Sequence, residues 1–111
     1  MPGTKPCRDP DGSNILLSGK FLKLAATDAV PLTIFEQTLS NPDYMIERKG
    51  REITYIKLIA NNINVLITAK RKEDSLVASR YILNPTEEDI SKLLKGGHLR
   101  IFEGGFYKAR V

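Results

Sequence analysis

Residues 51–72, REITYIKLIANNINVLITAKRK, constrain the fold of this chain more than any other stretch. Two runs rich in β-branched and aromatic residues flank the pair Asn61-Asn62. This pattern predicts a β-hairpin with a two-residue type I′ turn, because asparagine adopts positive φ at little cost. Lysines nevertheless occur inside both runs. We therefore expect one face of the hairpin to form the core and the other to be a cationic surface.

The predicted turn sets the register of the hairpin, because Ala60 then faces Ile63. Counting outward pairs Leu58 with Val65, Lys57 with Leu66, Ile56 with Ile67 and Tyr55 with Thr68. The predicted apolar face holds Thr54, Ile56, Leu58 and Ala60 with Ile63, Val65, Ile67 and Ala69. The predicted polar face holds Ile53, Tyr55, Lys57 and Ile59 with Asn64, Leu66, Thr68 and Lys70.

The segment SLVASRYIL, residues 75–83, predicts a third strand that completes an antiparallel meander. Its register is open by one residue, and a slip of one exchanges its two faces. Either Arg80 joins the polar face of the hairpin, or Ser79 and Tyr81 do. We favour Arg80 there, because the other register turns a guanidinium toward the core.

The segment DAVPLTIFEQTLSNPD, residues 28–43, predicts an amphipathic helix of about ten residues. Asp28 or Thr27 can cap its start, and Asn41-Pro42 ends it. The residues expected on its apolar stripe are Leu32, Phe35 and Leu39.

The segment NPTEEDISKLLKGG, residues 84–97, predicts a second helix. Asn84 is its expected cap and Pro85 its first residue, and Gly96 supplies the left-handed residue that ends it. Acidic residues at its start and lysines near its end complement the helix dipole. The residues expected to point inward are Ile90, Leu93 and Leu94.

The remaining segments are less regular. Residues 1–14 are rich in Pro and Gly and predict an irregular leader, and residues 15–26 suit either a short strand pair or a helix. A short strand that ends in a turn at Lys49-Gly50 is expected over residues 44–50, and a last hairpin or edge strand pair over residues 99–111. The order of elements predicts one α+β domain over residues 15–111, an antiparallel meander sheet with helices packed on one face.

Charge is distributed unevenly along the chain. The net charge is +4, and residues 44–81 carry eight Lys and Arg against four Asp and Glu. These residues include the predicted strands, so the sheet is expected to present a basic face, which is typical of proteins that bind nucleic acid or another polyanion. The same charge is also compatible with an ordinary solvated surface whose long side chains cover apolar atoms.

Several function classes are not supported by the sequence. Cys7 is the single cysteine and His98 the single histidine, so neither a disulfide nor a metal site is predicted, and no cofactor is expected. No signal-type segment and no apolar run of membrane-spanning length occurs in the chain. We therefore expect a cytoplasmic protein without membrane contact.

The polar face contains groups that suit phosphate chemistry. Attack of an RNA 2′-hydroxyl on its own phosphate needs groups that orient the hydroxyl, stabilise charge and move protons, and it needs no metal. The candidates for catalysis are Lys57, Thr68, Ser79, Arg80 and Tyr81. The candidates for RNA binding are Tyr55, Lys70, Arg71 and His98.

Three phrases, IFEQTLSNPDYMI, REITYIKLI and INVLITAKRKEDSLVASRYIL, together resemble the phage- and mobile-element-associated members of the barnase/EndoU/colicin/RelE-like nuclease superfamily. The resemblance covers residues 30–83, about half of the chain. It implies an antiparallel sheet with helices on one side and metal-independent cleavage of tRNA or another structured RNA. It also implies a toxin or phage-conflict setting with a cognate inhibitor protein.

The resemblance extends to individual positions. Lys57 is similar to the strand lysine of the family, Ser79-Arg80-Tyr81 to the end of its third strand, and Thr68 to a helper residue. Many relatives have a histidine near the start of the first helix, where this chain reads TDAVPL. Either His98 substitutes for it, or the base is another residue, or this copy binds RNA without cutting it.

Two other hypotheses remain open beside the ribonuclease. One is a nucleic-acid-binding module that uses the same face without catalysis. The other is a protein-interaction module, with an antitoxin-like or phage structural role, whose contact patch contains Ile53, Tyr55, Ile59 and Leu66. The expected partners are thus RNA, an inhibitor protein, or a second copy of the chain that forms a homodimer.

Overall fold

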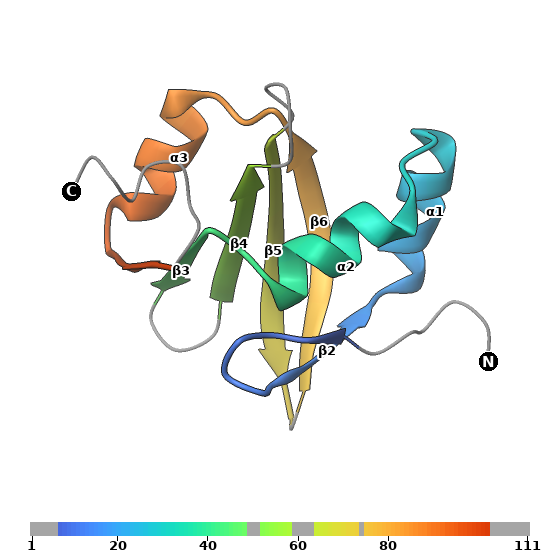
Figure 1. Ribbon diagram of the computed structural model, residues 1–111, viewed down its shortest axis with the longest axis horizontal. Coiled ribbons are helices and arrows are strands. Elements are labelled where there is room, and N and C mark those ends of the chain that lie inside the picture. Colours follow the sequence, from blue (N-terminus) through green and yellow to red (C-terminus); the bar gives the residue numbers. More distant parts are fainter. Residues whose placement is uncertain (1–6, 49–51, 59–63, 74, 103–111) are drawn as a thin grey trace.

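The computed structural model of the protein describes residues 7–48, 52–58, 64–73 and 75–102. These form a curled sheet in the order β1-β2-β6-β5-β4-β3-β7 with three helices against it (Figure 1). The strands are β1 Cys7–Arg8, β2 Asn14–Leu17, β3 Tyr44–Arg48, β4 Glu52–Leu58, β5 Asn64–Lys72, β6 Ser75–Leu83 and β7 Gly97–Ile101. The helices are α1 Gly19–Thr27, α2 Leu32–Ser40 and α3 Glu87–Leu94. None of these helices is long and apolar enough to cross a membrane.

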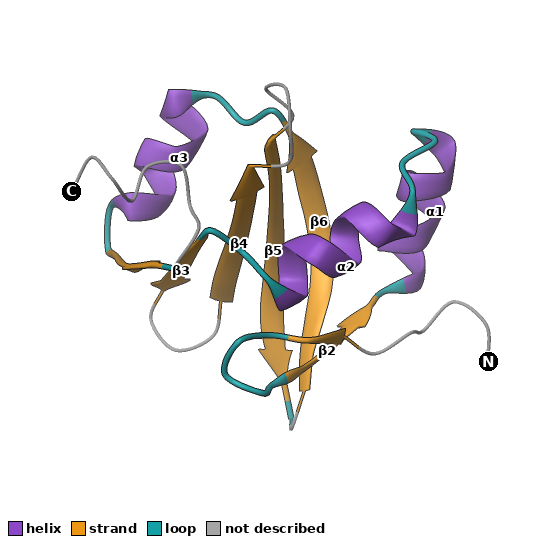
Figure 2. Cartoon of the chain, in the orientation of Figure 1, coloured by secondary structure: helices purple, strands orange, loops and turns teal. Residues whose placement is uncertain are grey.

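The predicted α+β class and the antiparallel meander are confirmed, since β3, β4, β5 and β6 pair in succession. One pairing is parallel, between β2 and β6. The two core clusters show that the helices do not all cover one face, although the sequence predicted that they would, and Figure 2 shows α3 apart from α1 and α2, at the opposite edge of the sheet. Helices α1 and α2 pack on one face, here called the front face, whereas Leu93 of α3 packs with Ile46, Ile56 and Leu66 on the opposite, back face.

The front face holds the larger core. Phe21 of α1, Phe35 of α2 and Tyr81 of β6 form an aromatic cluster, with ring centroids 4.8 to 5.1 Å apart. Edge-on and tilted contacts of this kind add stability beyond the area that they bury. The predicted apolar residues of α2 are partly confirmed, because Phe35 and Leu39 are buried but Leu32 is exposed.

The predicted register of the hairpin is wrong by one residue. In the structure Tyr55 pairs with Ile67 and Lys57 with Val65, where the sequence predicted Thr68 and Leu66 as their partners. The slip changes the membership of both faces. Ile53, Tyr55 and Lys57 lie on the front face with Val65, Ile67 and Ala69. Thr54, Ile56 and Leu58 lie on the back face with Asn64, Leu66 and Thr68. The expected turn at Asn61-Asn62 falls outside the described residues.

The physical reason is that both faces of this hairpin are covered. Tyr55 is completely buried on the front face, and Leu66 is almost completely buried on the back face. The sequence argument assumed one buried and one open face, in which case alternation selects the register. When helices cover both faces, apolar side chains are required on each, and alternation no longer distinguishes two registers that differ by one residue.

The third strand is confirmed over residues 75–83. Arg80 pairs with Thr68 on the back face, in the register that the sequence favoured. A bulge then shifts the pairing, so that Ala69 faces Ala78 and Ser79 is the extra residue. The bulge allows Ala78 to stay in the front core while Arg80, two residues later, projects from the back.

The predicted helix caps need correction. Residues 14–27 contain both a strand and a helix, and Ser18 caps α1 by accepting a hydrogen bond from the Phe21 amide. Thr27 and Asp28 therefore end α1 instead of starting α2, whose cap position is Pro31, without a side-chain bond. The sequence pattern hid this, because only three residues separate the C-cap of α1 from the start of α2.

The cap of α3 is Thr86, which forms a capping box with Asp89, and not the predicted Asn84. Asn84 lies at positive φ and its side-chain oxygen accepts from the Asn64 amide, so it connects β6 to the start of β5. Gly96 has positive φ as predicted. Of the residues expected to point inward, Leu93 is buried and Ile90 is half-buried, whereas Leu94 is exposed.

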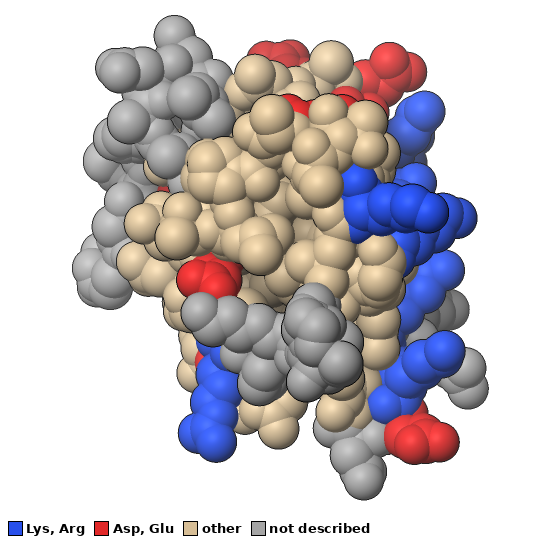
Figure 3. Space-filling model, turned by 90° about the vertical axis from the view of Figure 1, so that its right-hand side faces the viewer, with Lys and Arg blue, Asp and Glu red and all other residues tan. Residues whose placement is uncertain are grey.

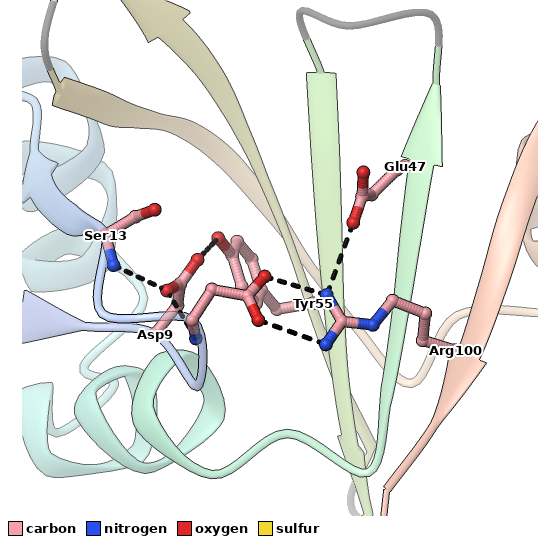
Figure 4. A network of polar contacts seen from close by, with 6 residues as sticks. Asp9, Ser13, Glu47, Tyr55 and Arg100 are labelled. Carbon is pink, nitrogen blue, oxygen red and sulfur yellow. Dashed lines mark hydrogen bonds and ion pairs between the residues drawn. The ribbon is translucent and has the colours of Figure 1, made fainter.

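Residues 7–14, expected within an irregular leader, form β1 and the turn into β2. The Asp9 carboxylate accepts hydrogen bonds from the amides of Asp11 and Ser13, and its second oxygen accepts one from the Tyr55 hydroxyl at 2.7 Å (Figure 4). This buried network attaches the turn to the centre of the sheet. Arg100 of β7 adds a two-point contact to the Asp11 carboxylate, at 2.7 and 3.0 Å.

Candidate functional site

The back face of the sheet divides into two halves. Helix α3 covers the half formed by β3, β4 and the first residues of β5, where Ile46, Ile56 and Leu66 meet Leu93. The half formed by the later residues of β5, the residues of β6 that pair with them, β2 and β1 carries no helix on this side among the described residues. Strand alternation and register place four cations on this uncovered half, Arg8, Lys70, Lys72 and Arg80, here called the basic surface.

Arg8 and Lys72 lie at the two ends of one line across the sheet, that is, a row of residues that are neighbours on successive strands. Arg8 of β1 pairs with Asn14 of β2, and Lys72 of β5 pairs with Ser75 of β6. The residues that follow Asn14 and Ser75, Ile15 and Leu76, pair with each other, which places Asn14 beside Ser75. The line therefore crosses four strands with a cation at each end and two polar side chains between them. Neighbouring strands are about 4.8 Å apart, so the two cations are separated by about 14 Å along the line.

The other two cations lie on the next two lines. Lys70 pairs with Val77, and Arg80 pairs with Thr68, the residue two positions before Lys70 in β5. Side chains at alternate positions of a strand are about 7 Å apart. The basic surface thus extends both along β5 and across the strands beside it.

The space-filling view shows this concentration of charge. Figure 3 turns the right-hand side of Figure 1 to the viewer, so that the far side of Figure 1 lies along its right edge, where Lys and Arg side chains form a column. Within the described ranges, no ion pair joins any member of the basic surface to a carboxylate. Glu52, the pairing partner of Lys70, instead forms an ion pair with Arg48 at 3.4 Å.

Arg80 lies where the basic surface meets α3. Hydrogen bonds with the Thr86 backbone and side chain hold the pKa of Asp89 below its usual value, and the charge of Arg80 adds a smaller effect in the same direction. The guanidinium is exposed to solvent. It is therefore available to an anionic partner at the edge of the basic surface.

Lys57 does not join this surface. It projects from the front face, where its ammonium donates a hydrogen bond to the backbone carbonyl of Asn41 at 2.9 Å. Lys57 and Arg80 are thus on opposite sides of the sheet, and the prediction that they share one face is wrong. The cause is the register of the hairpin described above.

The predicted hydroxyl groups are also separated. Thr68 lies on the back face but is 2% exposed, and its hydroxyl is 3.5 Å from that of Thr54. Ser79 donates a hydrogen bond to the Thr68 carbonyl at 3.3 Å. The Tyr81 hydroxyl is on the front side, where it donates to the Asp28 carboxylate. These groups serve internal hydrogen bonds and do not converge on one point.

The candidates for RNA binding are divided in the same way. Lys70 is on the basic surface, whereas Tyr55 is buried in the front core. Arg71 is exposed on the front side. Burial raises the pKa of the Tyr55 hydroxyl, and the positive charge of Arg71 offsets a small part of that rise. His98 is exposed on β7 at the far edge of the sheet, opposite Glu47.

Sequence reasoning missed two members of the basic surface. Arg8 was placed in the leader, and no local pattern indicated that β1 joins the sheet. Lys72 falls within RKED, residues 71–74, a segment whose charge predicts a turn between the second and third strands, but β5 continues to this residue. The strict alternation of Lys70 and Lys72 after Thr68 was the available signal for a strand that long.

Within the ranges that the structure describes, no three His, Cys, Asp or Glu side chains are grouped so that they could hold a metal ion. Comparisons with protein-family models, with curated proteins and with solved structures find no match to this chain. The resemblance to the nuclease superfamily therefore remains a prediction from sequence, and the basic surface is the feature from which function can be argued.

Proposed function

We propose that this protein is a nucleic-acid-binding module that holds the phosphate backbone of RNA on the basic surface. The supporting observation is that Lys70, Lys72 and Arg80 project together from an uncovered half of the sheet, with Arg8 on the same side. RNA is the partner to test first, because the sequence resemblance points to RNA.

The arrangement of the cations suits a polyanion better than a single small anion. The four charges are spread over lines about 7 Å apart along the strands and up to about 14 Å across them. A flexible phosphate backbone can follow such a surface and release its counterions at each contact. Lysine and arginine on the face of a sheet supply affinity without base selectivity, because they contact phosphate and not base edges.

Cleavage of RNA stays a separate prediction. The mechanism expected from the sequence required Lys57 and Arg80 in one cleft, and these residues are on opposite sides of the sheet. Binding requires only the basic surface. The binding module is therefore the function that this geometry supports best.

The test compares two double variants with matched chemistry. Lys70→Ala with Arg80→Ala removes one lysine and one arginine from the basic surface, and Lys57→Ala with Arg71→Ala removes the same pair of residue types from the front side. Binding of a labelled single-stranded RNA is followed by fluorescence anisotropy between about 50 and about 200 mM salt. Each lost phosphate contact lowers the salt slope by about 0.7, so the back-side variant is expected to lose about 1.4.

The front-side variant is expected to keep the affinity and the slope of the native protein. Equal losses of RNA affinity in both variants, or no RNA binding by the native protein, would refute the basic surface as the binding site. The same samples, run on a denaturing gel with a metal chelator, test for strand scission. Cleavage that survives Lys57→Ala would remove that residue from any mechanism.

A further inference from the structure

Strand β7 forms the edge of the sheet away from the basic surface, and among the described residues no strand pairs with its outer side. The Phe102 amide donates to the Asp43 carbonyl, so Phe102 directs its backbone groups inward, toward β3. Backbone direction alternates along a strand of an antiparallel pair, so Arg100 also points inward, whereas Leu99 and Ile101 point outward. The outer edge of β7 thus offers amides and carbonyls that can pair with another strand.

An apolar groove of about 490 Å³ lies beside this edge, between α3 and the back face of strands β3, β4 and β7. Leu94 of α3 and Leu99 and Ile101 of β7 line it, and these side chains are 39%, 40% and 38% exposed. Exposed apolar residues that share one site usually mark a contact surface. Leu99 and Ile101 therefore present apolar side chains and outward backbone groups at the same edge. None of the three residues belongs to the basic surface, so RNA binding does not explain them.

We propose that a second copy of this chain docks at this edge, with the two β7 strands paired antiparallel about a two-fold axis at Leu99. Antiparallel pairing of two identical edge strands is symmetric and joins two sheets into one. The register centred on Leu99 pairs every residue of β7, with Gly97 opposite the partner's Ile101. It also uses the outward direction of Leu99, because the residue on the axis exchanges both backbone hydrogen bonds with its own copy.

The apolar side chains complement one another in this arrangement. The axis is perpendicular to the sheet, so both copies turn the back face to the same side and the two grooves adjoin. Helix α3 passes close over Gly97, since a Cβ there would lie 2.6 Å from the Leu93 carbonyl oxygen. The partner's Ile101, which pairs with Gly97, therefore comes to the end of α3, where Leu94 is exposed. Each copy thus covers apolar residues that the other leaves exposed.

Charge on the front side of β7 favours the same register. Arg100 contacts two carboxylates there, Asp11 at 2.7 Å and Glu47 at 3.3 Å. With Leu99 on the axis, Arg100 faces the partner's His98, whose imidazole N–H can donate to this excess of carboxylate. A register centred on Arg100 would instead set two guanidinium groups directly opposite each other, which is unfavourable.

The first experiment follows the mass of the full chain by sedimentation equilibrium between about 1 µM and about 1 mM, the range in which modest interfaces associate. The native protein is expected to pass from the mass of one chain to that of two and no further, because the two-fold contact closes on itself. Leu99→Glu and Leu99→Lys are each expected to stay at the mass of one chain, since each sets like charges together at the axis. An equimolar mixture of these two variants is expected to associate where neither does alone, because glutamate then faces lysine.

Leu83→Glu is the matched control, because Leu83 is a strand leucine with the same exposure as Leu99, 40%, outside the groove. It is expected to dimerise like the native protein. A native protein that stays at the mass of one chain, an equal loss of association in Leu83→Glu, or a mixture that does not associate would overturn the proposal. Masses beyond two chains would overturn it as well, because they require a contact that does not close.

Amide hydrogen exchange of the native protein tests the same edge independently. The Leu99 and Ile101 amides are expected to exchange more slowly as the protein concentration rises, whereas the Arg100 amide, which points toward β3, is expected to be protected throughout. Protection of Leu99 that does not depend on concentration would assign the edge to another segment of the same chain, against the proposal. Neither measurement contains RNA, so failure here is distinguishable from failure of the basic surface.

Discussion

The two faces of the sheet are built by the same strands but are covered differently. On the front face, α1 and α2 close over an aromatic cluster in which Phe35 is completely buried. On the back face, α3 covers one half only, over a smaller apolar cluster, and leaves the basic surface and the apolar groove accessible. This difference indicates that the front face supplies most of the stability, whereas the back face is the more accessible of the two.

The largest expected difference between the two faces is the loss of stability when a core side chain is truncated to alanine. Phe35→Ala on the front face is expected to lower the free energy of unfolding by about 3–5 kcal/mol, because it leaves a large cavity in a closed cluster. Leu93→Ala on the back face is expected to cost about 2 kcal/mol, at the low end for leucine, because the site adjoins an open groove. Urea unfolding measures both values. A larger loss for Leu93→Ala would reverse the assignment of the stable face.

Buried hydroxyl groups give a second comparison. Tyr55→Phe removes a hydrogen bond to the buried Asp9 carboxylate on the front side and is expected to cost about 1–3 kcal/mol. Thr54→Val removes a longer contact to the Thr68 hydroxyl at 3.5 Å on the back side, with an expected cost below about 1 kcal/mol. Because the Tyr55 bond anchors the β1–β2 turn, amide exchange of Ser13 should accelerate in Tyr55→Phe alone. Unchanged exchange there would mean that the turn is held by other contacts.

Alkaline titration gives the smallest effect. Burial, together with the hydrogen bond to Asp28 and the charge of its carboxylate, raises the pKa of Tyr81 from 10.0 to about 12. A group whose pKa is raised in the folded state contributes stability that is complete below its unfolded pKa and is lost as the pH rises toward the folded one. The free energy of unfolding should therefore fall as the pH rises from about 10 to about 12. Urea unfolding at several pH values is expected to show a less steep fall in Tyr81→Phe than in the native protein. A back-face change such as Thr54→Val is expected to leave the steepness unaltered.

Much of the fold could be predicted because its signals are local. The strand at residues 75–83 and the helix after Asn84 follow from alternation and from end signals within about ten residues. The helix caps were harder, because Asp28, Asn84 and Thr86 are all good cap residues and sequence alone does not rank them. Strand β1 was missed because two residues carry no periodic pattern.

The candidate site was predicted less well than the fold. Lys70 and Arg80 were identified as cations on the polar face, and the structure places both on the basic surface. Lys57 was assigned to the same face through a register that is wrong by one residue. A small error in pairing has a large effect on a site, because a one-residue slip moves a side chain to the other side of the sheet.

The amino-acid sequence by itself determined where the central strands, α2 and α3 lie and where the positive charge is concentrated, because these depend on residues that are close together in the chain. The tertiary structure decided which side chains share a face, and hence which cations form one surface. Apolar residues are needed on both sides of this sheet, so its register depends on packing between elements that are distant in the sequence, and local alternation cannot supply that information.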